Sequence, residues 1–207
     1  MKHIAITQRV NIVDSYVERR DALDQRWINF FLSVNLLPIL VPNNINYIKK
    51  LVNDVRIDGV LLTGGENLAK YGGNVPERDE VEFFLINWAV EHNMPLLGVC
   101  RGMQVIQDYF NNKLNKVPNH VKVRHSLVVE NDCRLSDLLK SYKDVNSFHN
   151  YGSHEVNFEL KKIASSLDGV VMAIEHQQKN IFGVMWHMER EFPFCNTDQA
   201  LFNHIFS

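Results

Sequence analysis

The stretch PLLGVCRGMQVIQDYF, Pro95 to Phe110, is the part of the chain from which the fold can be worked out. The residues up to Val99 form a short apolar run, which predicts a buried strand, and the apolar residues that follow repeat with helical spacing. Cys100 therefore lies at a predicted strand-to-helix turn. Gly98 and Gly102 remove β-carbons where the chain must reverse sharply, and such a turn exposes its central side chain at the top of a sheet.

The same pattern of a short apolar run and a helical repeat extends from this stretch toward the N-terminus. Strands are predicted at His3–Thr7, Pro38–Val41, Gly59–Leu62 and Leu96–Val99, and helices at Ala22–Val34, Ile45–Val55 and Glu80–Glu91. Alternation of this kind predicts a parallel sheet with helices on both faces, whose functional residues lie at the carboxyl ends of the strands.

The pattern changes after about residue 122, where short β-like segments are separated by polar turns. These segments are Ser126–Val129, Val145–Phe148, Val170–His176 and Ile181–Met185, and a helix is predicted at Asp198–Phe206. The fold class is therefore α/β: a mostly parallel, doubly wound sheet flanked by helices, with a small antiparallel extension in the C-terminal half. A length of 207 residues predicts one domain over residues 1–207.

Composition limits the classes of partner and the compartment. The formal net charge is -2, so no basic field favours a nucleic acid polymer or a membrane surface. The three cysteines are odd in number and widely spaced, which fits neither a disulfide framework nor a metal site and favours a reducing compartment. The first residues lack the apolar region of a signal peptide, and no later run is long enough to span a bilayer, so we expect a cytoplasmic protein.

A base for the cysteine is available near the end of the chain. His187 follows the apolar run Ile181–Trp186, so it also lies at a predicted strand end, and Glu189 comes two residues later. A carboxylate in this position could fix the imidazole tautomer and leave the other ring nitrogen to face a thiol. The start of a helix behind Cys100 would favour its thiolate. A buried structural thiol is the alternative for a lone cysteine.

Three motifs resemble the class I glutamine amidotransferase superfamily: GVCRGMQ around Cys100, WHME at Trp186–Glu189 and DGVLLTGGEN before and after Gly64. The pair Arg78-Asp79 with Glu82, CRGMQVI and VNSFH at Val145–His149 resemble its γ-glutamyl-amide hydrolase branch, which includes the γ-glutamyl-γ-aminobutyrate hydrolases. Met188 departs from the family pattern, in which proline is usual.

The resemblance implies a role for each site residue. Cys100 is expected to be the nucleophile, His187 the base and Glu189 the residue that orients it. The backbone N–H groups of Gly65 and Arg101 are the expected oxyanion donors, as acyl transfer requires. The remaining expected substrate contacts are Gly64, Gln104, Phe148, His149 and Tyr151, with packing as the alternative for Phe148 and Tyr151. Arg78, Asp79 and Glu82 are expected to brace the loop before a helix rather than touch substrate.

The expected function is that of a free-standing hydrolase, because the chain has no room for a fused synthetase domain. It would cleave a γ-glutamyl amide through a cysteine thioester and release glutamate and an amine, with no metal and no organic cofactor. One alternative is a glutaminase subunit that supplies ammonia to a separate synthase. Another is a non-catalytic binding or regulatory protein on the same fold. The sequence leaves open a homodimer or a synthase partner.

The leaving amine is expected to lie near the loop that follows the first strand. This loop, Gln8–Asp24, contains Arg19 and Arg20 together with Tyr16. Arginine suits bidentate recognition of phosphate and tyrosine can stack on a base, although charged loop residues are often only solvated. An anionic leaving group, such as a nucleotide phosphoramidate, is therefore one expectation beside polyamine-derived amides. The family includes a γ-glutamyl-CDP-amidate hydrolase, and this small chain resembles it.

Overall fold

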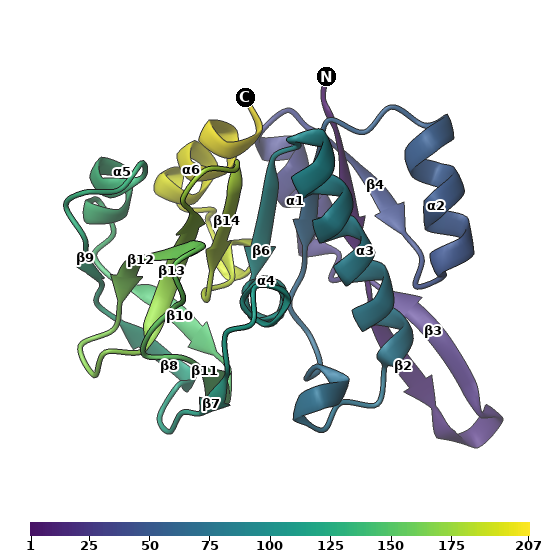
Figure 1. Cartoon of the computed structure of the whole chain (residues 1–207), viewed down its shortest axis with the longest axis horizontal. Helices are drawn as coiled ribbons and strands as arrows, with labels where there is room; N and C mark the ends of the chain where they lie inside the picture. The colour runs from purple at the N-terminus through teal and green to yellow at the C-terminus, as the bar shows by residue number, and fades with distance from the viewer.

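The computed structural model describes residues 1–207, and its centre is an eight-stranded sheet (Figure 1). In spatial order the strands are β4 (Leu37–Val41), β1 (His3–Thr7), β5 (Gly59–Leu62), β6 (Leu96–Val99), β14 (Ile181–Val184), β13 (Val171–His176), β12 (Leu160–Ser165) and β9 (Val128–Val129). The first five are parallel, and β13, β12 and β9 continue the sheet in antiparallel pairing. The predicted α/β class and its antiparallel extension are confirmed.

Helices cover both faces of the sheet. They are α1 (Arg26–Ser33), α2 (Ile45–Asp54), α3 (Pro76–His92), α4 (Arg101–Tyr109), α5 (Ser136–Lys140) and α6 (Asn196–Phe206). In Figure 1, α3 and α4, the latter seen end-on, lie in front of the sheet and α1 lies behind it. Phe30 of α1 contacts Phe202 of α6 with ring centroids 5.2 Å apart, so these two helices share a face. Every residue of β5 and β6 is buried, as expected for parallel strands covered on both sides.

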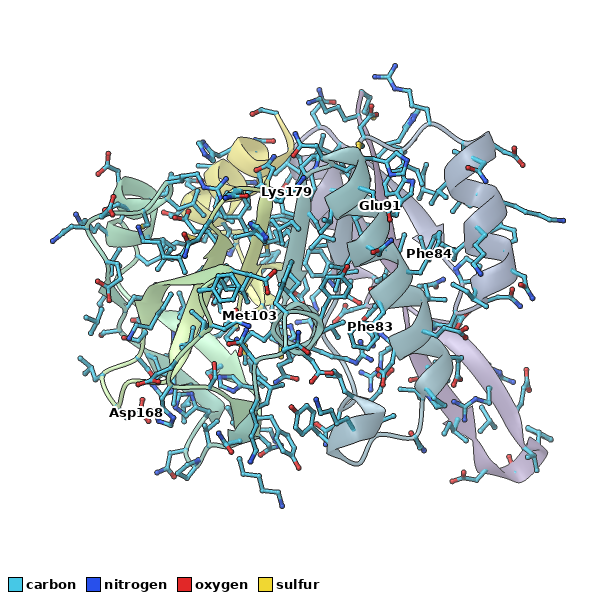
Figure 2. The ribbon with its side chains drawn as sticks, in the orientation of Figure 1. Phe83, Phe84, Glu91, Met103, Asp168 and Lys179 are labelled. Atoms are coloured by element: carbon cyan, nitrogen blue, oxygen red, sulfur yellow. The ribbon has the colours of Figure 1, made fainter.

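Helix α4 lies closest to the sheet. Met103, labelled near the centre of Figure 2, is fully buried on this helix and packs against Gly183 of β14. A β-carbon at Gly183 would lie 2.8 Å from Met103 Cγ, so only glycine permits this approach. The apolar side of α4 is thus part of a hydrophobic cluster of 48 buried residues that extends across the sheet.

The segment Gln8–Asp24, predicted as a loop, contains a β-hairpin. Strands β2 (Arg9–Val13) and β3 (Glu18–Ala22) pair antiparallel around a short 3-10 turn at Asp14–Tyr16. The hairpin extends away from the sheet at the lower right of Figure 1, and most of its residues are exposed. Only Val10 of the two strands is buried, and the second strand begins with four charged residues, so the sequence has no clear strand pattern there. Helix α1 consequently begins at Arg26 rather than at Ala22.

Helix α3 begins at Pro76, earlier than the predicted start at Glu80. The first turn buries Arg78 and no apolar side chain, so hydrophobic periodicity does not mark it. Proline at the first helical position is favourable because its missing N–H would have no partner there.

The second half of the chain contains elements that the sequence pattern did not predict. These are β12, α5, β7 (Asn115–Lys116), β8 (Val121–His125) and β11 (Tyr151–Gly152). The predicted segment Val145–Phe148 is β10, which pairs with β8 in one small sheet, while β7 pairs with β11 in another. Two further 3-10 turns lie at Ala69–Tyr71 and Met188–Arg190. None of the helices combines the length and the apolar character needed to cross a membrane.

Candidate active site

Topology brings the predicted site segments to one edge of the sheet. Strands β5, β6 and β14 are neighbours and run parallel, so their carboxyl ends meet at the same edge. Gly64 and Gly65 follow β5, Cys100 follows β6 and His187 follows β14. Residues far apart in the sequence therefore lie together for the reason expected of an open parallel sheet.

Cys100 occupies a strained turn between β6 and α4. Its backbone has φ 53° and ψ -104°, a conformation that non-glycine residues rarely adopt and that is found at functional sites. The Cys100 N–H donates to the carbonyl oxygen of Val184 at 2.7 Å, which fixes the turn to the end of β14. The residue is buried, with 5% of its surface exposed, and the free N–H groups of α4 begin directly behind it.

The glycines on either side of Cys100 serve close packing. A β-carbon at Gly102 would collide with the carbonyl group of Leu62 in β5, and one at Gly98 would collide with the backbone of Gly102. The first turn of α4 is thus held against two strands. The expectation that Gly98 and Gly102 make the sharp reversal is only partly met, because Cys100 itself has the positive φ.

His187 and Glu189 form a buried hydrogen-bonded pair. Nδ1 of His187 lies 2.7 Å from Oε1 of Glu189, and both side chains are almost fully buried. Burial by itself disfavours the imidazolium, but the charges of Cys100 and Glu189 outweigh it and raise the pKa of His187 to about 9. The Phe148 ring meets the imidazole edge to face at 5.8 Å. Glu189 thus holds Nδ1 protonated and leaves Nε2 without a bond to the carboxylate.

Asn146 holds the backbone of His187. Its Oδ1 accepts from the His187 N–H at 2.8 Å, and its Nδ2 donates to the His187 carbonyl oxygen at 2.8 Å. The sequence analysis did not single out this residue, although it lies within the VNSFH segment. Its role depends on β10 packing beside the end of β14. The local sequence pattern does not predict that contact.

The two backbone N–H groups that were expected to be oxyanion donors have no acceptor. They belong to Gly65, after β5, and to Arg101, the first residue of α4. Gly65 has φ 149°, which favours glycine, and a β-carbon at Gly64 would lie 2.5 Å from Cε1 of His187. The main chain at 64–65 therefore approaches the imidazole as closely as glycine allows.

Three of the predicted substrate contacts meet around one carbonyl group. Nε2 of Gln104 donates to the Tyr151 carbonyl oxygen at 2.9 Å, and Nδ1 of His149 lies 3.0 Å from the same oxygen. Burial, reinforced by nearby His120, lowers the pKa of His149 to about 3, so its ring is neutral. Because a carbonyl only accepts, Nδ1 of His149 carries the proton, and the buried Nε2 is an acceptor without a partner.

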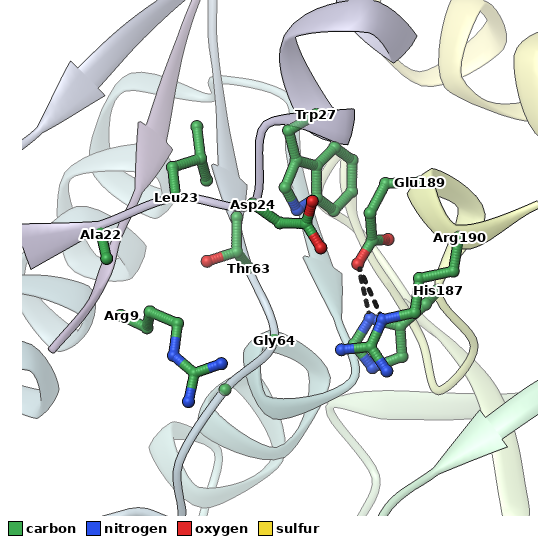
Figure 3. Close-up of a pocket in the computed structure, with 11 residues that line it drawn as sticks. Arg9, Ala22, Leu23, Asp24, Trp27, Thr63, Gly64, His187, Glu189 and Arg190 are labelled. Carbon is green, nitrogen blue, oxygen red and sulfur yellow. Dashed lines mark hydrogen bonds and ion pairs between the residues drawn. The ribbon is translucent and has the colours of Figure 1, made fainter. Parts of the chain in front are cut away.

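A pocket opens beside the His187–Glu189 pair (Figure 3). Arg190 lines it, with its guanidinium stacked 4.5 Å above the Phe148 ring and its Nε 3.6 Å from Glu189 Oε1, too far for a good hydrogen bond. The other lining residues are Arg9, Ala22, Leu23, Asp24, Trp27, Thr63, Gly64 and Gly65. Arg190 therefore brings a positive charge to the pocket, with Glu189 as a distant ion-pair partner.

Arg19 and Arg20 lie outside this pocket, although Arg9 of the same hairpin lines it. Arg19 binds Glu77 and donates to the Asn74 carbonyl oxygen at 3.0 Å, while Arg20 binds Glu18. Both guanidinium groups are thus already paired on the exposed hairpin. Elsewhere, no group of three or more His, Cys, Asp or Glu side chains is arranged to hold a metal ion.

Comparison with known proteins adds the family. The Peptidase C26 profile matches residues 4–189. The chain belongs to the Peptidase C26 family. This family is of the class I glutamine amidotransferase type, as the motifs predicted, and membership makes the protein a cysteine-type amide hydrolase.

Two relatives and one solved structure illustrate this membership. The chain is 34% identical over 195 residues to a γ-glutamyl-CDP-amidate hydrolase of Campylobacter jejuni, covering 91% of this chain and 90% of that one. It is 28% identical to a γ-glutamyl-γ-aminobutyrate hydrolase of Escherichia coli O157:H7, covering 81% and 78%. A glutamine amidotransferase of Thermotoga maritima has the same fold, with a TM-score of 0.66 at 14% identity over 98% of this chain and 83% of that chain.

Proposed function

We propose that this protein hydrolyses a γ-glutamyl amide and releases glutamate and an amine. The observation that carries the proposal is the strained turn at Cys100, placed against the buried His187–Glu189 pair at one edge of the sheet. Two relatives whose names include γ-glutamyl amide hydrolysis support the substrate class.

Acyl transfer proceeds through Cys100. Its thiolate attacks the γ-carbonyl carbon, and the oxygen that becomes negative accepts from the free N–H groups of Gly65 and Arg101. Protonated Nε2 of His187 gives its proton to the leaving nitrogen, the C–N bond breaks, and the amine departs from a glutamyl thioester. Neutral His187 then takes a proton from water, the resulting hydroxide attacks the thioester, and the thiolate leaves as glutamate forms.

The glutamyl end is bound on the side of β11 and α4. Gln104 and His149 converge on the Tyr151 carbonyl, and the unpaired Nε2 of His149 is an acceptor suited to the α-ammonium group of glutamate. Phe148 closes the site by packing on His187. We assign the reaction to the cytoplasm, where reducing conditions keep the three cysteines as free thiols.

The amine leaves through the pocket of Figure 3, and we propose that it carries negative charge. Arg190 is the main support, because its guanidinium is fixed over Phe148 but lacks a good hydrogen-bonded partner. A relative that acts on a γ-glutamyl-CDP-amidate supports the same class of leaving group. Arginine forms strong charge-assisted bonds with phosphate oxygens.

The test is direct detection of the thioester. With γ-glutamyl amides as substrates, fast quench and intact-mass analysis should show a glutamyl adduct on Cys100 and none on Cys133 or Cys195. Cys100→Ala should abolish turnover, and His187→Asn should be nearly as severe, because nucleophile and base act as a unit. Glu189→Gln should lose less activity.

Two results would contradict the proposal. An adduct on another cysteine, or a Cys100→Ala rate within a few fold of the original, removes the assigned nucleophile. Release of glutamate from glutamine but from none of the other γ-glutamyl amides favours the glutaminase subunit instead. Absence of both activities in the original protein favours a binding protein on this fold.

A further inference from the structure

A fully buried arginine lies beneath the glycine loop of the site. The Arg78 side chain comes from α3, and its Nη2 donates to the carbonyl oxygen of Thr63 at 2.8 Å and to that of Gly64 at 3.1 Å. The same nitrogen donates to Thr63 Oγ1 at 3.1 Å. One guanidinium thus holds the two carbonyl groups that precede Gly65.

Peptide geometry converts this contact into an orientation of the Gly65 N–H. In a planar trans peptide, the C=O and N–H groups point in opposite directions. Because Arg78 binds the Gly64 carbonyl oxygen from the buried side, the Gly65 N–H must point away from the core, and Gly64 and Gly65 both line the open pocket. This N–H has no other partner in the structure.

The orientation of the Gly64–Gly65 peptide has to be set by contacts from outside the loop. Glycine populates positive and negative φ about equally, so neither side chain nor local strain selects one orientation of the peptide between two glycines. A rotated peptide would point its carbonyl oxygen at the site and repel a developing oxyanion. The contacts of Arg78 are therefore what selects the orientation.

The same network reaches the other free N–H group. Glu82 accepts from Nε of Arg78 at 2.9 Å through Oε1 and binds the buried guanidinium of Arg101 through Oε2. Asp79 also binds Arg101. Arg101 contributes the free N–H at the start of α4. The Glu82 carboxylate therefore connects Arg78, which positions the Gly65 N–H, with Arg101, which carries the other free N–H.

We propose that Arg78 is a positioning residue for the oxyanion hole: it fixes the direction of the Gly65 N–H and, through Glu82, its placement relative to the Arg101 N–H. This inference rests on the proposed function, since it assigns a purpose to the two free amides of that site. Arg78 touches no substrate and acts only through the backbone that it holds.

The experiment separates oxyanion stabilisation from thiolate reactivity. Arg78→Lys keeps the buried positive charge but cannot hold Thr63 and Gly64 together with Glu82. Arg134→Lys is the matched control, because Arg134 also binds two backbone carbonyl oxygens, of His176 at 2.7 Å and Lys179 at 3.1 Å, and a carboxylate, on Glu175. Acylation is measured in single turnovers of γ-glutamyl-p-nitroanilide. Alkylation of Cys100 by iodoacetamide, which forms no oxyanion, is measured across pH.

Arg78→Lys should slow acylation by about 10²-fold, the typical effect of losing one oxyanion donor, with KM nearly unchanged. Its alkylation rate and pH profile should match those of the original protein, and Arg134→Lys should change neither reaction by more than about twofold. Thr63→Val removes one acceptor of the same Arg78 nitrogen and leaves every charge in place. Thr63→Val serves as the test if Arg78→Lys does not fold. Its acylation rate should fall by less than that of Arg78→Lys, and its alkylation rate should not change.

The inference is overturned if acylation by Arg78→Lys, or by Thr63→Val where the lysine variant does not fold, equals that of the control. It is also overturned if alkylation falls in parallel with acylation, because Arg78 would then act on the thiolate or on the whole site. A different result would contradict the proposed function itself. In that case iodoacetamide alkylates Cys100 of the original protein, but no γ-glutamyl substrate transfers a glutamyl group to it.

Discussion

The charge state of His187 is set by burial on one side and by Cys100 and Glu189 together on the other. An imidazole this deeply buried is ordinarily easier to deprotonate, yet the pKa of His187 is raised to about 9. Because this pKa lies above the unfolded value of about 6.5, the pair stabilises the fold fully below about pH 6.5. That stabilisation is lost as the pH rises through about 9.

Removal of the thiol should reverse this shift. In Cys100→Ala, burial of His187 remains but the negative sulfur is gone, so we expect the pKa of His187 to fall clearly below 9. NMR titration of the ring carbons measures it directly. His149 serves as an internal control, since its pKa of about 3 arises from burial and from His120. An unchanged His187 titration in the alanine variant would mean that no ion pair with Cys100 exists.

At the scale of elements, the arginines considered for the leaving group lie on two different elements. Arg19 and Arg20 project from β3 and are neutralised by Glu77 and Glu18. Arg190 ends the 3-10 turn after β14 and lies beside the His187–Glu189 pair, without a good hydrogen-bonded partner. The sequence analysis placed leaving-group recognition on the hairpin, which stays a prediction, and the geometry favours Arg190.

Two substrates that differ only in phosphate distinguish these arginines. For γ-glutamyl-phosphoethanolamine, we expect Arg190→Ala to lower kcat/KM by about tenfold or more, since a hydrogen bond to a charged group contributes roughly 1.5 to 3 kcal/mol. For γ-glutamylethanolamine the same variant should change kcat/KM by about twofold at most. In the double variant Arg19→Ala/Arg20→Ala, any change in kcat/KM should be the same for both substrates. A selective loss in the double variant, with none in Arg190→Ala, would return recognition to the hairpin.

At the scale of the whole molecule, one hydrophobic cluster includes residues from both ends of the sheet. It extends from Ile4 in β1 to Ile163 in β12 and Phe206 in α6. The parallel and antiparallel parts of the sheet meet where β14 pairs with both β6 and β13. No boundary in the core divides the chain at this point.

We therefore expect residues 1–207 to unfold as a single cooperative unit, which tests the predicted single domain. Calorimetry should give one transition whose measured enthalpy equals the van't Hoff enthalpy. Hydrogen exchange should be slowest in β1, β5, β6 and β14, and fastest in the exposed β2–β3 hairpin. Two separate transitions, with β12–β13 unfolding independently of β1–β6, would divide the chain into two domains.

The sequence by itself determined the parallel sheet and which chain segments follow the ends of its strands. Buried strands and amphipathic helices leave local periodicities, and the carboxyl ends of parallel strands are where a cysteine turn and a late histidine must meet. For this reason β1, β5, β6 and β10 have the predicted bounds, and the predicted class is observed. The hairpin and the first turn of α3 were missed because their residues are exposed or buried as ion pairs, which produces no apolar pattern.

The tertiary structure alone decided how the site is held and charged. Arg78 on the Gly64 carbonyl, Asn146 on the backbone of His187 and the stacking of Arg190 on Phe148 all join segments distant in sequence. Whether an arginine is buried, neutralised by a carboxylate or left available depends on which chain segment packs beside it. Residue type and spacing cannot specify that, because the partners are brought together only when the sheet and its helices assemble.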